Sequence, residues 1–180
     1  MKRWSWSAVV LAALMPCLAQ AGMIGIGAYG GLSIPIAQDD NGQGPIFGLR
    51  VPVRLAPMFT VEPFFAMTQA GDADQEIGGI QYTRDGFEAT GFGANLLLTF
   101  GDKIQFYPFG GLSMSTLSRE GSEDLELTGF NFGLGLGVSP VEKVRLHLRG
   151  EGQSLIKDER GRMFGNVTVG VSYDLFPFGQ

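Results

Sequence analysis

The chain has 180 residues, of which 13 are basic and 18 acidic, and its formal net charge at pH 7 is −5. It offers no basic face to nucleic acid, so the sequence argues against a nucleic-acid partner. Cysteine and histidine occur once each, as Cys17 and His147, which excludes a zinc site built from several such ligands, and we predict no cofactor. The length suits a single domain.

Residues 1–21, MKRWSWSAVVLAALMPCLAQA, have the pattern of a secretory signal peptide. A basic start, an apolar run and the small-residue site Ala-Gln-Ala follow one another, and the run is too short to span a membrane as a helix. Cleavage after this site leaves residues 22–180 as one mature domain. The alternative is a lipoprotein signal that ends at Cys17, but Pro16 fits poorly where such processing requires a small residue.

Beyond the signal, apolar and polar side chains alternate with the period of two that is typical of a strand with two unlike faces. The alternation recurs in eight segments, at residues 23–34, 46–55, 59–67, 90–100, 104–116, 130–138, 144–153 and 166–176. Strands of about ten residues cross a bilayer at a tilt of about 45°, and these segments have that length. In the fifth segment, the missing N–H of Pro108 predicts a local bulge.

Short and long connections follow one another in turn. The turns APM, GDK and SPVEK join segments two and three, four and five, and six and seven. We expect loops at the longer polar connections, which are residues 35–45, 68–86, 117–129 and 155–162. Short turns on one side and long loops on the other are typical of an eight-stranded, antiparallel, up-and-down outer-membrane barrel, with both chain ends on the periplasmic side.

The long connections are acidic. Their carboxylates are Asp39, Asp40, Asp72, Asp74, Glu76, Asp85, Glu120, Glu123, Asp124 and Glu126. Solvated loops are the simplest interpretation, and the sharper hypothesis is contact with lipopolysaccharide through bridging cations, or with an unknown extracellular partner. The stretch DDNGQG lacks the full ligand register of a calcium loop, so we predict no metal site.

The alternation alone does not say which face of each strand meets water. In a soluble, lipocalin-like barrel the charged face points outward, whereas in a transmembrane barrel lipid lies outside and charges lie inside. Only three lysines follow the signal, although a soluble barrel would spread lysine over its outer face. The polar face is also rich in glycine, which leaves room inside a narrow barrel for long side chains. Both observations favour the transmembrane barrel.

Long charged side chains share the glycine-rich face. They are Arg50, Arg54, Glu62, Arg145, His147, Arg149 and Glu151. Buried charges are costly unless they pair, and the interior of an eight-stranded barrel is just wide enough for side chains to fill, so we predict that these residues close the lumen as a charge network. Aromatic residues should mark the membrane interfaces, with Phe59, Phe100, Phe106, Tyr173 and Phe176 on the periplasmic side and Phe47, Phe65 and Phe130 on the other.

Two stretches resemble the small OmpA/OmpX-type outer-membrane barrels, and the overall pattern is similar over nearly the whole mature chain. FYPFGGLSM, at 106–114, is similar to their Pro-aromatic-x-Gly strand, and FNFGLGLGVSPVEKVRLHLRGE, at 130–151, to their glycine-alternating strand, tight turn and charged strand. The resemblance implies insertion by the outer-membrane assembly machinery. The family usually ends on an aromatic residue, whereas here Phe178 is followed by Gly-Gln, and Pro177 should interrupt the ladder.

These observations predict an integral outer-membrane barrel with a structural or adhesive surface role, surrounded by outer-membrane lipid and lipopolysaccharide. One alternative is a narrow conduit for small solutes or hydrophobic molecules. Another is an outer-membrane enzyme that modifies lipid A, for which His147 is the only candidate acid or base. His147 points inward, with no serine beside it in the sequence, whereas such enzymes reach lipid on the outer wall. We therefore predict that the chain is not an enzyme.

Overall fold

A computed structural model describes residues 22–37, 41–77, 80–119, 121, 123–157 and 160–178. The expected signal peptide, residues 1–21, lies outside these ranges, as do the acidic residues Asp39, Asp40 and Glu120. Within the described ranges, no helix is both long and apolar enough to cross a membrane.

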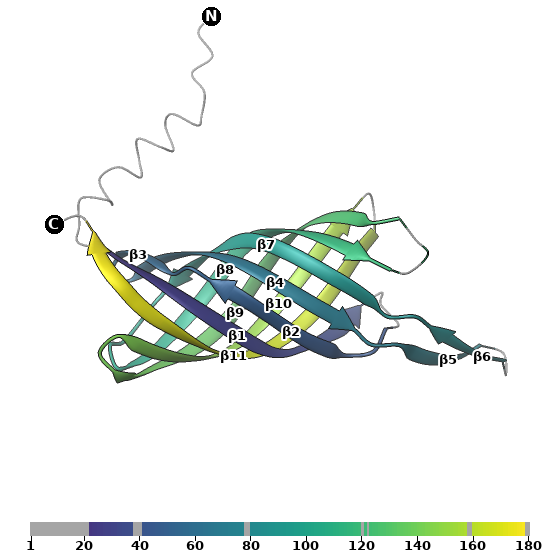
Figure 1. Cartoon of the computed structure of the whole chain (residues 1–180), viewed down its shortest axis with the longest axis horizontal. Coiled ribbons are helices and arrows are strands. Elements are labelled where there is room, and N and C mark those ends of the chain that lie inside the picture. The colour runs from purple at the N-terminus through teal and green to yellow at the C-terminus, as the bar shows by residue number, and fades with distance from the viewer. Residues whose placement is uncertain are drawn as a thin grey trace, which may run out of the picture.

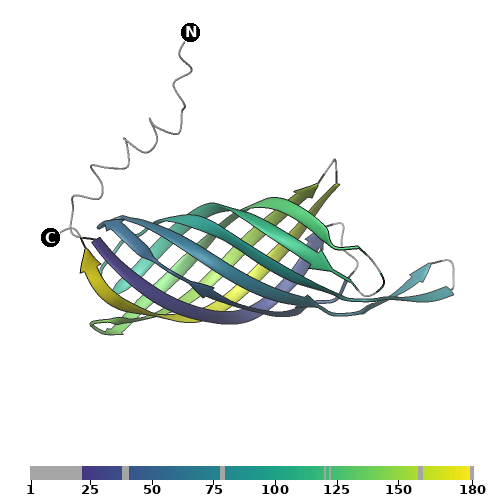
Figure 2. The ribbon, with the colours of Figure 1, turned by 45° about the horizontal axis from the view of Figure 1, so that its top comes forward.

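The described chain is a closed antiparallel barrel with a projecting hairpin (Figure 1). Its strands are β1 (Gly22–Ala37), β2 (Gly44–Arg50), β3 (Val53–Ala56), β4 (Phe59–Ala70), β5 (Ala73–Ile77), β6 (Ile80–Arg84), β7 (Phe87–Leu98), β8 (Ile104–Ser118), β9 (Leu125–Val141), β10 (Val144–Lys157) and β11 (Arg160–Phe178). The ring runs in the order β11-β10-β9-β8-β7-β4-β2-β1, and pairing of β11 with β1 closes it. The hairpin β5–β6 extends beyond one end of the ring (Figure 2).

β2 and β3 are two parts of one barrel strand. Arg50 pairs with Phe64 and Val53 pairs with Val61, so both parts keep one register against β4. The interruption at Val51 and Pro52 also keeps its bonds to the neighbouring strands, with N–H···O distances of 2.9 Å from Val51 to Pro63 and from Gly25 to Pro52. The ring therefore has eight strands, and the prediction of an eight-stranded antiparallel barrel is confirmed.

The register also defines the slant of the strands. A path that steps from each residue to its partner on the next strand visits Ile24, Val53, Val61, Leu96, Gly110, Phe132, Gly152, Gly165 and Ile34. It leaves β1 at Ile24 and returns at Ile34, an offset of ten residues (34 − 24). With eight strands spaced at about 4.8 Å, this offset requires a tilt of about 40° from the barrel axis.

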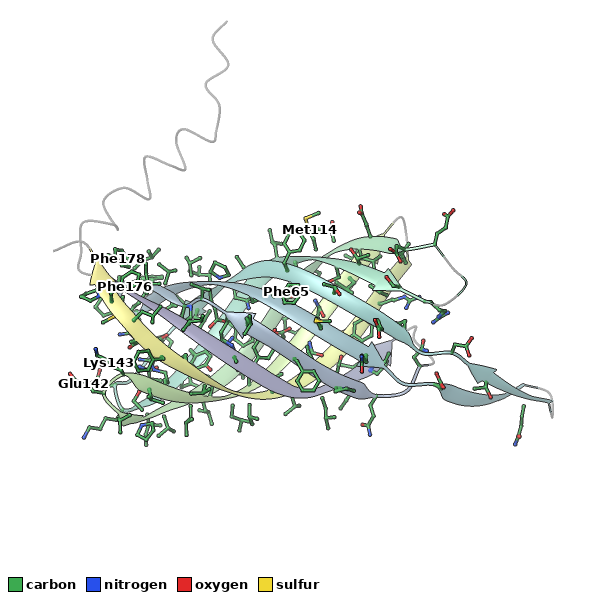
Figure 3. The ribbon with its side chains drawn as sticks, in the orientation of Figure 1. Phe65, Met114, Glu142, Lys143, Phe176 and Phe178 are labelled. Atoms are coloured by element: carbon green, nitrogen blue, oxygen red, sulfur yellow. The ribbon has the colours of Figure 1, made fainter. Side chains whose placement is uncertain are left out.

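The short turns and the two ends of the described chain gather at one end of the barrel. Gly22 pairs with Phe178, and Glu142 and Lys143, in the turn between β9 and β10, lie at the same end (Figure 3). The expected interruption by Pro177 is wrong, because Pro177 pairs with Met23 and a register shift between Ile24 and Gly25 absorbs the irregularity.

The expected bulge at Pro108 is also wrong. Phe100 and Phe106 exchange two backbone hydrogen bonds, of 2.9 and 3.0 Å, and two residues further along Leu98 and Pro108 would form the next such pair. Proline has no N–H to donate there, and β7 ends at Leu98. The register between β8 and β9 runs through Pro108 without a shift, because the missing donor faces β7 and not β9.

The long connections contain more strand than expected. β9 has 17 residues and β11 has 19, so much of the expected loops at 117–129 and 155–162 belongs to strands. The expected loop at 68–86 contains the hairpin β5–β6. Loops are expected there because these connections are long and polar; in the structure, the polarity of the two strand faces is reversed at these ends relative to the rest of the barrel.

The reversal is clearest along β9. From Phe130 onward, apolar residues point outward and small or polar residues point inward, as a membrane barrel requires. Before Phe130, exposed Glu126 and Thr128 point outward, while buried Leu127 points inward. The same change occurs at the ends of β7 and β8, where Glu88, Thr90 and Thr116 face outward beside inward Phe87 and Leu117. On this side of the barrel, the end next to the long loops is built like a soluble barrel, with a polar outside and an apolar inside.

Candidate functional site

The interior of the barrel holds all seven charged or titratable side chains that the sequence assigns to the lumen. Arg50, Glu62, His147 and Arg149 are 1–9% exposed, and Arg54, Arg145 and Glu151 are half-buried. All seven therefore lie on the inward face of their strands in the structure. The alternation does not assign their partners, which lie on strands far apart in the sequence.

One ion pair spans the lumen. Arg149 on β10 donates to both carboxylate oxygens of Glu62 on β4, at 2.5 and 2.7 Å. In the ring of eight, three strands separate β10 from β4 on either side, so the pair joins opposite walls. A two-pronged, charge-assisted contact of this kind is among the strongest that side chains make, and here water barely reaches it. This pair is the central obstruction of the barrel.

A chain of hydrogen bonds continues from this pair toward the periplasmic end. Arg149 Nε donates to the hydroxyl of Tyr107 at 3.0 Å, and that hydroxyl lies 2.8 Å from His147 Nδ1. His147 Nε2 lies 2.8 Å from Ser172 Oγ. Tyr107 and Ser172 are buried, with exposed fractions of 1% and 2%. Together with Glu62, Arg149 and His147, they make a chain of five side chains from four strands across the lumen. The alternation along β8 and β11 is enough to put Tyr107 and Ser172 on the inward face, but it does not identify them as members of this network.

Glycine makes room for the aromatic rings inside. Tyr107 pairs with Gly135 across β8 and β9, and a Cβ on Gly135 would lie 2.2–2.6 Å from atoms of the Tyr107 ring. Tyr29 lies over Gly48 in the same way, with ring atoms 2.3–2.4 Å from the position of a Cβ. An inward tyrosine directly opposite an inward glycine is the sequence signal that could have identified Tyr107, once the register was known.

Arg50 has no carboxylate partner comparable to the one that Arg149 has in Glu62. It is 2% exposed, its Nε and Nη1 atoms make no hydrogen bond, and its guanidinium carbon lies 4.2 Å from the ring centroid of Tyr29. Glu151 accepts a hydrogen bond from Asn166 at 3.2 Å instead of from an arginine. Arg50, Glu151 and Asn166 line a cavity of about 40 Å³, which has room for a few water molecules. Direct pairing of inner charges is therefore seen at the Arg149–Glu62 contact and not at Arg50.

The periplasmic end of the lumen carries a looser cluster. Arg54 and Arg145 both approach one carboxylate oxygen of Asp174, at 3.8 and 3.7 Å. Arg54 is about one-third exposed in its side chain, so this contact is screened by water. The alternation along β11 is enough to put Asp174 on the inward face, but it does not identify these arginines as its partners.

The opposite end of the lumen is apolar, which the sequence analysis did not predict. Phe87, Leu117, Leu127, Leu155 and Phe164 form a buried cluster there, with each side chain 2–6% exposed. Its members lie in or beside the stretches that were expected to be loops. The sequence does contain a signal for this cluster, because Leu125 and Leu127 continue the inward parity of residues 129 and 131. The prediction of a purely polar lumen is at odds with that signal, since it leaves no place for apolar residues on the inward face.

Ser172 and His147 form the pair that a serine nucleophile and its base require, yet they lie inside the barrel. The outer wall, where lipid would be reached, is on the other side of β10 and β11. Both side chains are at least nine-tenths buried, and Tyr107 covers the second nitrogen of the imidazole. Within the part of the chain that the structure describes, no group of three or more His, Cys, Asp or Glu side chains could hold a metal ion.

The outer wall is apolar over the middle of the barrel. Leu112, Val169 and Leu134 are 70%, 62% and 55% exposed, which is far more apolar surface than a soluble protein leaves in water. The eight aromatic residues predicted for the interfaces are all on this wall, between 41% and 60% exposed. Phe65 and Met114 can be followed there in Figure 3, and the assignment of the aromatic residues to membrane interfaces stays a prediction.

No protein-family model matches the sequence, and no curated protein matches it either. Solved structures share the fold. Neisserial surface protein A matches with a TM-score of 0.61 at 14% identity, over 86% of this chain and 97% of that one. A major outer membrane protein of Thermus thermophilus matches with a TM-score of 0.66 at 10% identity, over 87% and 100%. The outer membrane protein OprG of Pseudomonas aeruginosa matches with a TM-score of 0.59 at 12% identity, over 88% and 99%.

At these identities the likeness establishes the fold. The resemblance to small OmpA/OmpX-type barrels is confirmed at that level. An apolar wall of this extent needs lipid around it, and the fold is that of eight-stranded outer-membrane barrels. The chain is a multi-pass β-barrel of a bacterial outer membrane.

Proposed function

We propose that this barrel is a structural and surface-displaying outer-membrane protein whose lumen is closed by its own side chains, and that it is neither a channel nor an enzyme. The observation that carries this proposal is the contact of Arg149 with Glu62, which joins opposite walls of the barrel at 2.5 and 2.7 Å. Tyr107 fills the space beside it, and the apolar cluster around Phe87 fills the outer end.

The room left inside is small. Above the ion pair lies the cavity of about 40 Å³, and below it lies one of about 20 Å³, lined among others by Arg54, Gln105 and His147. Each cavity holds only a few water molecules at most, and neither provides a continuous path for a hydrated ion. Closure thus depends on a tightly bonded pair in the middle and an apolar plug at the outer end.

The surface role is supported by the parts of the chain that extend past the apolar wall at the end with the long loops. The hairpin β5–β6 extends beyond one end of the ring (Figure 1). Near the same end, the outer faces of β7 and β9 carry exposed polar residues, among them Glu88, Glu126 and Thr128. Carboxylates at Asp72, Asp85, Glu123 and Asp124 are exposed at this end. Such a surface suits contact with lipopolysaccharide through bridging divalent cations, or with an extracellular partner. Insertion by the outer-membrane assembly machinery is part of the same proposal.

Conductance in planar lipid bilayers tests the closed lumen. We expect the wild-type protein to give no stepwise current, and the double variant E62A/R149A to give brief, small openings because its central obstruction is gone. Frequent steps of one defined size from wild-type protein would overturn the proposal. A heat-dependent shift in gel mobility, with boiled and unboiled samples compared, confirms beforehand that each preparation is a folded barrel.

A narrow conduit is the second candidate, and one observation favours it. Glu62 lines both cavities, so displacement of the single Arg149–Glu62 contact would join them. In that case wild-type protein would conduct, and E62A/R149A would conduct more. A change in lipid A mass that depends on His147 would instead support the enzyme, which the burial of Ser172 and His147 argues against.

Neutralising the acidic surface tests the display role. The variant D72N/D85N/E123Q/D124N should lose divalent-cation-dependent retention of lipopolysaccharide, while the same number of Gln or Asn changes in the short turns should not. Unchanged retention and unchanged detergent sensitivity of the cells would argue that these loops are only solvated.

A further inference from the structure

The outer mouth of the barrel contains a pocket that the closed lumen does not explain. Its volume is about 120 Å³, and it lies where the ends of β7, β8, β9 and β11 meet. Phe87, Leu117 and Leu125 line its apolar part, and they belong to or pack against the buried cluster beneath. Arg119, Ser118, Glu123 and Arg162 line its polar part. An apolar floor beneath a partly basic rim is the arrangement that binds a molecule with one apolar end and one acidic end.

Arg119 is the residue that gives the pocket its chemistry. One of its terminal nitrogens donates to Asn41 Oδ1 at 3.3 Å, which holds the side chain at the mouth. Its Nε is shielded from solvent and has no hydrogen-bond partner. Because Nε is shielded, a ligand at the rim would meet the terminal nitrogens of the guanidinium, and a carboxylate is the acceptor that matches these donors best.

Arg162 adds to the basic character of the same rim. Its guanidinium carbon lies 5.5 Å from the centroid of the Phe87 ring, so the positive charge sits directly beside the apolar floor. Among the charged side chains that line the pocket, two are basic and Glu123 is acidic. Asp72, Asp85 and Glu88 line the neighbouring surface groove together with Arg119, and this negative surface disfavours ligands of high negative charge.

The size of the apolar part limits the ligand further. An apolar cavity of roughly 150 Å³ accepts a benzene ring, and this pocket is somewhat smaller but opens at the mouth. One ring or a short aliphatic chain therefore fits against Phe87, Leu117 and Leu125, with its acidic group at the rim. We propose that the outer mouth binds small amphipathic monocarboxylates, with the carboxylate on Arg119 and the apolar group on the floor. This binding leaves the lumen closed, so it does not depend on the function proposed above.

Benzoate is a suitable probe, because it is soluble and carries both parts. Protein extracted from outer membranes of cells grown with methyl-labelled leucine would be placed in lipid nanodiscs and titrated by NMR. We expect saturable shifts of the Leu117 and Leu125 methyl signals, with a Kd of about 1 mM for a ligand of this size. The methyls of Leu134, which faces lipid, report any partition of the probe into the bilayer.

Three related compounds separate the two requirements. Acetate has the carboxylate without the ring, benzyl alcohol has the ring without the charge, and benzylamine reverses the charge. Each should bind at least about tenfold more weakly than benzoate if both parts of the pocket are used. Equal shifts with benzyl alcohol, or equal shifts at Leu134, would reduce the effect to partition and overturn the proposal.

Variants locate the site. R119Q should weaken benzoate binding at least about fivefold, and L125W should abolish it by filling the floor. K103Q, in a short turn at the opposite end of the barrel, is the matched control and should bind benzoate like the wild type. The gel-mobility test shows that each variant is folded. Binding that is unchanged in R119Q, or no saturable shift with wild-type protein, rules out the site.

Discussion

Replacement of Glu62 by leucine tests the central ion pair most directly. Arg149 is 4% exposed and donates two terminal N–H groups to Glu62. The change removes the acceptor of both and leaves only the bond from its Nε to Tyr107. Loss of one partner of a buried pair costs about 3–5 kcal/mol, because the other charge stays buried without compensation. We therefore expect E62L to lower the free energy of unfolding by about that amount, and R149L to do the same by stranding Glu62.

The double variant E62L/R149L separates this penalty from simple loss of packing. Two leucines replace the pair with apolar groups, and such replacements are commonly neutral to within about 1–2 kcal/mol. The two single effects should therefore not add, and the coupling energy should be about 3 kcal/mol or more. Urea unfolding in phospholipid vesicles, followed by circular dichroism and gel mobility, measures all four free energies.

Two results would refute this reasoning. If E62L costs less than about 1 kcal/mol, then Arg149 has another route to solvent or another acceptor, and the pair is not the central obstruction. If the cost of the double variant equals the sum of the two single costs, the residues act independently, and the contact between them contributes nothing specific to stability.

Three further predictions concern packing and lipid contact. G135A should lower the free energy of unfolding by about 1–3 kcal/mol, because its Cβ would lie 2.2 Å from the Tyr107 ring. G150A should change it little, since nothing lies within 4 Å of the position of its Cβ. Equal effects of the two changes in urea unfolding would contradict the packing of the Tyr107 ring over Gly135. L155A should cost about 2–5 kcal/mol by opening a cavity in the apolar outer cluster, and a cost under about 1 kcal/mol would show that the cluster is not a packed core. L148R, on the lipid-facing wall, should lower the free energy of unfolding by about 2–4 kcal/mol. T128R, on the polar outer face beyond the apolar wall, should lower it by only about 0–1 kcal/mol. Similar losses for both would mean that the lipid-facing part of the wall does not end before Thr128.

The barrel, and the side of its wall on which each residue lies, can be predicted from the sequence. Side chains on a strand alternate with a strict period of two, so the parity of Arg149 or Leu148 along the chain is enough to separate lumen from lipid. The scarcity of lysine and the abundance of glycine on the polar face then decide which side is wet. These are local properties, and no knowledge of contacts is needed to read them.

The contacts between inward residues cannot be predicted from the sequence, because they depend on how the closed barrel is assembled. Parity says nothing about height along the barrel axis, and the ten-residue offset around the ring determines which levels face each other. Glu62 and Arg149, 87 residues apart, meet because β4 and β10 stand opposite one another, whereas Arg50 makes no such contact. Ser172 reaches His147 for the same kind of reason, across the adjacent strands β10 and β11.

The apolar outer cluster is the part of the barrel that the sequence pattern mispredicts. A single rule for the whole strand, with apolar residues outward, holds only where lipid surrounds the wall. Beyond the belt, water lies outside, and Leu127 and Leu155 turn inward to form a core as they would in a soluble barrel. The sequence carries the alternation through this boundary without a break, and only the closed barrel shows on which side of it each residue lies.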